Sequence, residues 1–185
     1  MRTQWWDRLD LSSMESAKDV STPPTNRAGL AIGLGGLIAG VCDLTYAITF
    51  HSAHGIKPIR IPQSIASGLL GMTSYENGWL SASLGVALHF FIAFSAAAIY
   101  YLASRKLRIL LRAAPVCGML YGAAIFLFMR WVVLPLSAAP HFKSNPLANW
   151  TDFAVHVFLI GLPIALLARR YGSQDFGPEV ESGRN

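Results

Sequence analysis

The sequence predicts an all-α, polytopic membrane protein with four transmembrane helices and one short re-entrant or interfacial helix. Three observations support this fold class. The 185 residues are 53% hydrophobic and only 14% charged, whereas soluble domains usually carry about 25% charged residues. The apolar residues gather in four long segments of the kind that crosses a bilayer. The lysines and arginines gather in alternate connections, as the positive-inside rule describes for multi-pass membrane proteins.

The first predicted span covers residues 29–50, a nearly unbroken run of apolar and small side chains. About 20 such residues are enough to cross a hydrocarbon core of about 30 Å. Asp43 interrupts this run, and a charge at the bilayer centre costs about 3 kcal/mol on insertion scales. Gly36, Gly40 and Ala47 lie on the same helix face as Asp43. Asp43 is therefore expected to face a neighbouring helix.

Three more spans are predicted, at residues 79–103, 113–136 and 153–168. The connection after the first span contains the segment from Ser64 to Met72, which is too short to cross a bilayer. This segment predicts a helix that either re-enters the membrane or lies flat over the bundle, and we favour the flat arrangement. Pro58 and Pro62 before it indicate turns or extended chain.

The spans divide the chain into an N-terminal tail (1–28), a membrane domain (29–171) and a C-terminal tail (172–185). Basic residues are concentrated in both tails and in the 104–112 connection. This bias predicts that these three parts lie in the cytoplasm. No cleavable signal peptide is expected, because the first 28 residues lack an apolar core. The net charge of +5 indicates membrane topology and contact with lipid headgroups rather than nucleic-acid binding.

Glycines at four-residue spacing predict close contact between helices, because they allow two backbones to approach. The pairs are Gly29/Gly33 and Gly36/Gly40 in the first span and Gly118/Gly122 in the third. The run from Gly33 to Gly40 does not fit the dinucleotide motif GxGxxG, since residue 38 is isoleucine and no strand precedes it.

Each predicted span carries one ionisable side chain: Asp43, His89, Arg130 and His156. Straight helices place all four between the bilayer midplane and the outer face. We expect them to form a buried polar cluster in which Asp43 and Arg130 make an interhelical ion pair. The alternative for Arg130, which lies near a span end, is that its side chain extends to the outer lipid headgroups. Asp152 lies four residues before His156 and is expected to orient its imidazole.

Three interpretations of this cluster remain open. It fixes helix register in a structural or accessory membrane protein, it belongs to a small-solute or proton transporter or channel, or His89 and His156 hold a haem or metal in a redox subunit. Outside that last case no cofactor is expected. The chain has no HExxH or GxSxG motif, so an enzyme is not favoured. The expected partners are membrane lipids and either a second copy of the chain or another membrane protein.

Several segments resemble a family of conserved bacterial inner-membrane proteins with four helices, and more distantly the YagU-like proteins. They are GLIAGV in the first span, LHFFIAFSAAAIYYLA in the second, VVLPLSAAP after the third and VHVFLIGLPIALLARR in the fourth. The resemblance covers residues 30–171 and implies an inner-membrane location without implying an activity.

Overall fold

The computed structural model describes residues 24–140 and 146–172. The described chain is all-α, and four of its helical segments are long and apolar enough to cross a membrane, which confirms the predicted fold class. These segments are Arg27–Ala53, Gly78–Lys106, Ala114–Leu136 and Pro146–Gly172. In chain order the helices are α2 (Pro24–Ala53), α3 (Arg60–Leu70), η3 (Gly71–Tyr75), α4 (Gly78–Lys106), α5 (Ile109–Arg112), α6 (Ala114–Phe128), η4 (Met129–Val133), α7 (Leu134–Leu136), α8 (Pro146–Val155), η5 (His156–Gly161) and α9 (Leu162–Gly172).

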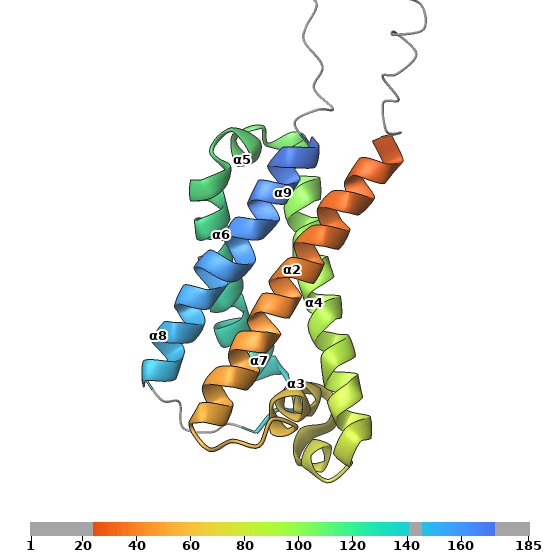
Figure 1. The fold of residues 1–185 in the computed structure, drawn as a ribbon, viewed down its shortest axis with the longest axis vertical. Coiled ribbons are helices and arrows are strands. Elements are labelled where there is room, and N and C mark those ends of the chain that lie inside the picture. The colour runs from red at the N-terminus through yellow and green to blue at the C-terminus, as the bar shows by residue number, and fades with distance from the viewer. Residues whose placement is uncertain (1–23, 141–145, 173–185) are drawn as a thin grey trace, which may run out of the picture.

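The four spans run side by side, with α2 packed against both α4 and α9 (Figure 1). The start of α2, the short helix α5 and the end of α9 lie at one end of the bundle, and α3 and η3 lie at the other. We call these the terminal end and the α3 end. The predicted tails fall mostly outside the described residues, although α2 already begins at Pro24, within the range assigned to the N-terminal tail.

The apolar core lies toward the terminal end, where the spans meet through small side chains and two tyrosines. Ala114, Ala165 and Tyr100 are almost completely buried there. The Tyr100 hydroxyl donates to the Leu110 carbonyl at 2.9 Å, and the Tyr121 hydroxyl donates to the carbonyl of Ala96 at 2.8 Å. These bonds satisfy the polar tips of the two rings and connect α4 to the α5–α6 segment.

The fourth span begins at Pro146, seven residues before the predicted start at residue 153. Thr151 and Asp152 reduce the apolar character of this first part, which is why hydropathy alone placed the start too late. Proline suits the first position of a helix, where its missing N–H needs no partner. The Thr151 hydroxyl donates to the carbonyls of Leu147 and Ala148, so it needs no solvent to satisfy it.

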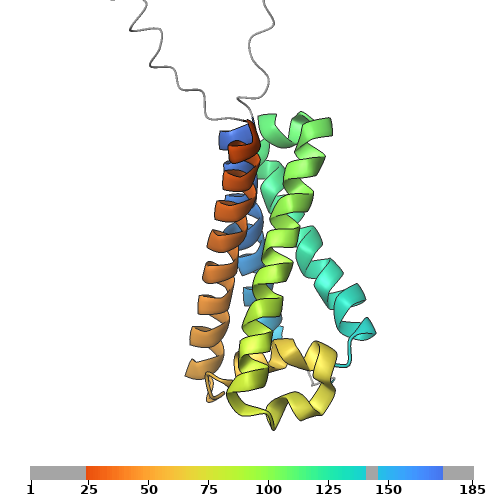
Figure 2. The ribbon, with the colours of Figure 1, turned by 90° about the vertical axis from the view of Figure 1, so that its right-hand side faces the viewer.

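The helix predicted at Ser64–Met72 is present but begins earlier, since α3 starts at Arg60 and ends at Leu70. Pro62 does not interrupt it, because the first turn of a helix tolerates proline. Figure 1 shows α3 nearly end-on and Figure 2 shows it lengthwise, so it runs across the end of the bundle. This arrangement agrees with the flat orientation that we favoured.

A buried hydrogen-bond network holds α3 and η3 against α4. The Gln63 side-chain amide donates to the Gly78 carbonyl at 3.0 Å. The Ser74 hydroxyl donates to the Gln63 carbonyl, and the Ser81 hydroxyl donates to the Ser74 carbonyl, both at 2.6 Å. At Gly85 of α4 a Cβ atom would overlap the carbonyl of Pro62. The α3–η3 segment is therefore a fixed part of the fold.

The third and fourth spans each contain a π-helical turn directly before a Leu-Pro pair. The first turn, η4, precedes Leu134–Pro135, and the second, η5, precedes Leu162–Pro163. A proline inside a helix lacks the N–H for the usual bond and clashes with the carbonyl four residues earlier. That carbonyl belongs to Trp131 in η4 and to Leu159 in η5, so the wider turns accommodate the two prolines. Figure 2 shows the third span diverging from α4 toward the α3 end.

The glycines predicted to mediate helix contacts behave in two ways. A Cβ at Gly36 or Gly40 would meet Phe94 or Phe90 of α4, and a Cβ at Gly118 or Gly122 would meet the backbone of the fourth span. By contrast, among the described residues nothing lies within 4 Å of a Cβ at Gly29 or Gly33. The GxxxG spacing of that last pair does not correspond to a contact within this bundle.

The contact between the third and fourth spans can be tested by adding one methyl group. Gly122→Ala should lower the free energy of unfolding by about 1–3 kcal/mol, because the Cβ would overlap the carbonyl of His156. Gly33→Ala is the matched control and should leave stability unchanged or raise it, since a Cβ there meets nothing within the described chain. Thermal unfolding of both variants in one detergent measures the difference, and equal effects would contradict the contact.

Candidate functional site

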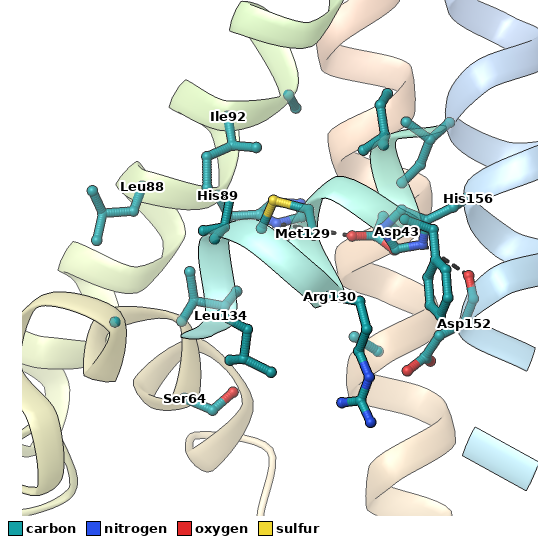
Figure 3. A pocket seen from close by; sticks show the side chains of 18 of the residues that line it. Asp43, Ser64, Leu88, His89, Ile92, Met129, Arg130, Leu134, Asp152 and His156 are labelled. Carbon is teal, nitrogen blue, oxygen red and sulfur yellow. Dashed lines mark hydrogen bonds and ion pairs between the residues drawn. The ribbon is translucent and has the colours of Figure 1, made fainter. Parts of the chain in front are cut away.

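A cavity of about 710 Å³ lies in the half of the bundle nearest the α3 end. Its wall is formed by α2, α3, α4, the second half of the third span with the connection after it, and the first half of the fourth span. All five side chains assigned to the polar cluster line this cavity, namely Asp43, His89, Arg130, Asp152 and His156 (Figure 3). They are partly exposed to it rather than fully buried, with 12% and 21% of the side-chain surface accessible at His89 and Asp43.

The two π-helical turns place two of these side chains at the cavity wall. Arg130 lies in η4 and His156 is the first residue of η5. A π-helical turn adds a residue to one turn of the helix and is frequent at functional sites. The sequence signal for both turns is a proline inside an apolar span. The prediction treated these spans as straight helices and therefore did not include the turns.

His89 of α4 faces two groups of α2. Its Nε2 lies 2.9 Å from the carbonyl oxygen of Gly40. A carbonyl only accepts hydrogen bonds, so Nε2 carries the proton and donates. The other ring nitrogen, Nδ1, lies 3.9 Å from the Asp43 carboxylate. Asp43 therefore has His89, and not Arg130, as its ionisable neighbour.

A second polar contact joins α2 to the fourth span. The Tyr46 hydroxyl donates to the Asp152 carboxylate at 3.0 Å. His156 does not use that carboxylate, because its Nδ1 donates instead to the backbone carbonyl of Asp152 at 2.8 Å. The expected orientation of the imidazole by the Asp152 side chain is therefore wrong; the carbonyl one helical turn earlier is the nearer acceptor. Phe126 packs edge-on against the His156 ring, with centroids 5.4 Å apart.

Arg130 does not form the expected ion pair with Asp43. Within the part of the chain that the structure describes, no acceptor lies within hydrogen-bond or ion-pair distance of its guanidinium. Figure 3 shows the side chain extended toward the α3 end, away from Asp43. Depth alone suggested the pair, but depth does not determine the direction in which a side chain leaves its helix. The cavity thus holds a cation without a counter-ion among the described residues.

Much of the remaining wall is apolar and comes from helices on opposite sides of the cavity. Leu88 and Ile92 of α4 line it (Figure 3), and so do Met129 and Val133 of η4. Sequence reasoning also missed several polar wall residues. These are Tyr46, His51, Ser64, Ser137 and Asn149. Tyr46 was the one with a usable signal, because it lies three residues after Asp43 on the same face of α2.

The arrangement of the histidines does not favour the haem or metal interpretation. Among the described residues no group of three or more His, Cys, Asp or Glu side chains is placed to hold a metal ion. His89 directs one ring nitrogen at Gly40 and the other at Asp43. Because Nε2 donates its proton to Gly40, only Nδ1 could offer a lone pair to iron, and Nδ1 faces Asp43 rather than His156.

The pairing of side chains at the cavity can be tested with two double-mutant cycles. Tyr46→Phe and Asp152→Ala should show a coupling of about 0.5–3 kcal/mol, since each change removes the same hydrogen bond. Asp43→Asn and Arg130→Gln provide the comparison, and their effects on stability should be additive. Thermal stability of each single and double variant in detergent gives both values. Coupling in the second cycle, or additivity in the first, would contradict the structure.

No protein-family model, curated protein or solved structure matches this chain. The resemblance to YagU-like proteins is thus not supported by these comparisons and remains a prediction. The four long apolar helices identify the chain as a small polytopic, integral membrane protein.

Proposed function

We propose that this membrane protein binds a small solute in the cavity and transfers it into or across the bilayer. The proposal depends on one observation: ionisable side chains from all four spans line a single cavity of about 710 Å³. Small-molecule sites typically have volumes of about 300–1,000 Å³, mainly apolar walls and a few polar groups that orient the ligand. The cavity has all three properties.

The state of Arg130 favours a binding site over a purely structural cluster. A cluster that only fixes helix register is expected to satisfy its own charges, because an unpaired charge inside a membrane is costly. Here Asp43 has His89 as a neighbour and Asp152 has Tyr46. Arg130 has no such partner in the described chain. A ligand group that pairs with Arg130 would account for its position.

The proposed orientation places the half of the bundle that holds the cavity on the outer side of the membrane. Basic residues gather at the terminal end of the bundle, near the start of α2, around α5 and near the end of α9 (Figure 1). They include Arg27, Arg105, Lys106, Arg108, Arg112, Arg169 and Arg170. The positive-inside rule then puts this end and both termini in the cytoplasm and the α3 end outside a bacterial inner membrane. Membrane lipids and a second copy of the chain are the proposed partners.

Reporter fusions test this orientation. Alkaline phosphatase should be active when fused after Gly55, at the α3 end, and inactive when fused after Arg108, at the terminal end. A fluorescent protein that folds only in the cytoplasm should give the opposite result at the same two positions. Activity of the phosphatase at Arg108 would reverse the proposed topology.

A cavity-filling substitution tests solute transfer. Ala47→Phe adds a ring at the cavity wall, whereas Ala87→Phe adds the same ring on an exposed face of α4 outside it. Proteoliposomes are assayed with a panel of small anionic, neutral and cationic solutes. We expect at least one solute to cross faster than in empty liposomes, with a loss of about tenfold in Ala47→Phe and little change in Ala87→Phe. Fluxes equal to those of empty liposomes throughout the panel would refute the proposal.

A further inference from the structure

We infer that the cavity binds a single-chain amphiphile with an oxyanion headgroup, which Arg130 holds while the alkyl chain lies between α4 and η4. This inference rests on the proposed function, because it names the class of solute that the same cavity takes. Its three supports are the unpaired guanidinium, the direction of the two carboxylates toward neighbours other than Arg130, and the apolar wall beside Arg130.

The guanidinium of Arg130 sets the chemistry of the headgroup. Arginine stays charged at any physiological pH, and its planar fork matches the two oxygens of a carboxylate or phosphate. Figure 3 shows this side chain between the level of Asp43 and the α3 end. No described residue supplies the anion that a charge in this position requires.

The carboxylates of the cavity do not compensate this charge. Asp152 accepts a hydrogen bond from Tyr46 at 3.0 Å, and Asp43 lies 3.9 Å from Nδ1 of His89. Figure 3 shows Arg130 directed away from Asp43. Each negative side chain therefore has its nearest polar neighbour on another helix, and neither one pairs with the cation.

The apolar wall beside Arg130 indicates that the rest of the ligand is apolar. Met129 and Val133 lie in the same π-helical turn as Arg130 and face the cavity, and Leu88 and Ile92 of α4 line its other side. The third span packs along the fourth span through α6, whereas η4 makes no extensive contact with α4. Figure 2 shows the third span diverging from α4 in this half of the molecule. An alkyl chain in this space would contact the apolar wall. Each methylene that moves there from water improves affinity by about fourfold. A small free oxyanion would leave the apolar wall unused.

The test compares matched probes on the protein in nanodiscs of phosphatidylcholine, whose zwitterionic headgroup limits competition. The probes are dodecanoate, dodecyl phosphate, dodecanol and inorganic phosphate, with binding measured by the shift in thermal unfolding as each is titrated. We expect dodecanoate and dodecyl phosphate to bind about 10–100-fold more tightly than dodecanol, as charge-assisted hydrogen bonds predict. The two anionic probes distinguish a carboxylate from a phosphate headgroup.

Three variants assign any anion preference to Arg130. Arg130→Gln should reduce the preference for the anionic probes to about twofold or less, while dodecanol binds as in the wild type. Arg130→Lys should retain part of it, because the charge remains but the fork is lost. Arg112→Gln, an exposed arginine at the terminal end, is the matched control and should keep the full preference. Binding of dodecanol to Arg130→Gln also shows that the variant is folded.

The outcomes separate this inference from the proposed function. Equal affinity for dodecanoate and dodecanol in the wild type, or an anion preference that survives in Arg130→Gln, would overturn the headgroup assignment. Inorganic phosphate binding as tightly as dodecyl phosphate would overturn the alkyl-chain assignment. Failure of all four probes to bind would refute the amphiphile as the ligand. In each case transfer of another solute, blocked by Ala47→Phe, would leave the proposed function standing.

Discussion

The close contact between the third and fourth spans is the constraint on which the rest of the structure depends. Gly118, Gly122 and Gly161 carry no Cβ, so the two backbones approach until carbonyls and glycine Cα atoms meet. The third span therefore packs along the fourth, and toward the α3 end it diverges from α4. The cavity lies in the space that this divergence leaves toward the α3 end, and α3 contributes part of its wall there.

The ionisable groups of the cavity differ in whether they have a polar neighbour, and this difference indicates which kind of ligand the site would bind. Each carboxylate has a neighbour from another helix, because His89 faces Asp43 and Tyr46 donates to Asp152. Arg130 lies in a π-helical turn that a following proline imposes, and no described residue pairs with it. In a low-dielectric environment such a group has a high free energy that a bound anion would lower.

Much of the fold could be predicted from the sequence because crossing a bilayer depends on local composition. About 20 apolar residues are enough to span it, and this requirement located all four spans and the short helix between the first two. The ends were less certain. The fourth span begins at Pro146 rather than at residue 153, since a helix continues through Thr151 and Asp152 when their polar groups find partners nearby.

The sequence by itself determined the number of spans and the residues whose charge needs an explanation. Only the tertiary structure decided which of these residues meet. Asp43 faces His89 and not Arg130, because a pairing depends on helix rotation and on π-helical turns that a straight-helix estimate of depth does not contain. Likewise Gly33 and Gly122 belong to the same GxxxG pattern, yet only Gly122 meets a backbone. A periodic pattern specifies a face of a helix, whereas the neighbour on that face is a property of the whole bundle.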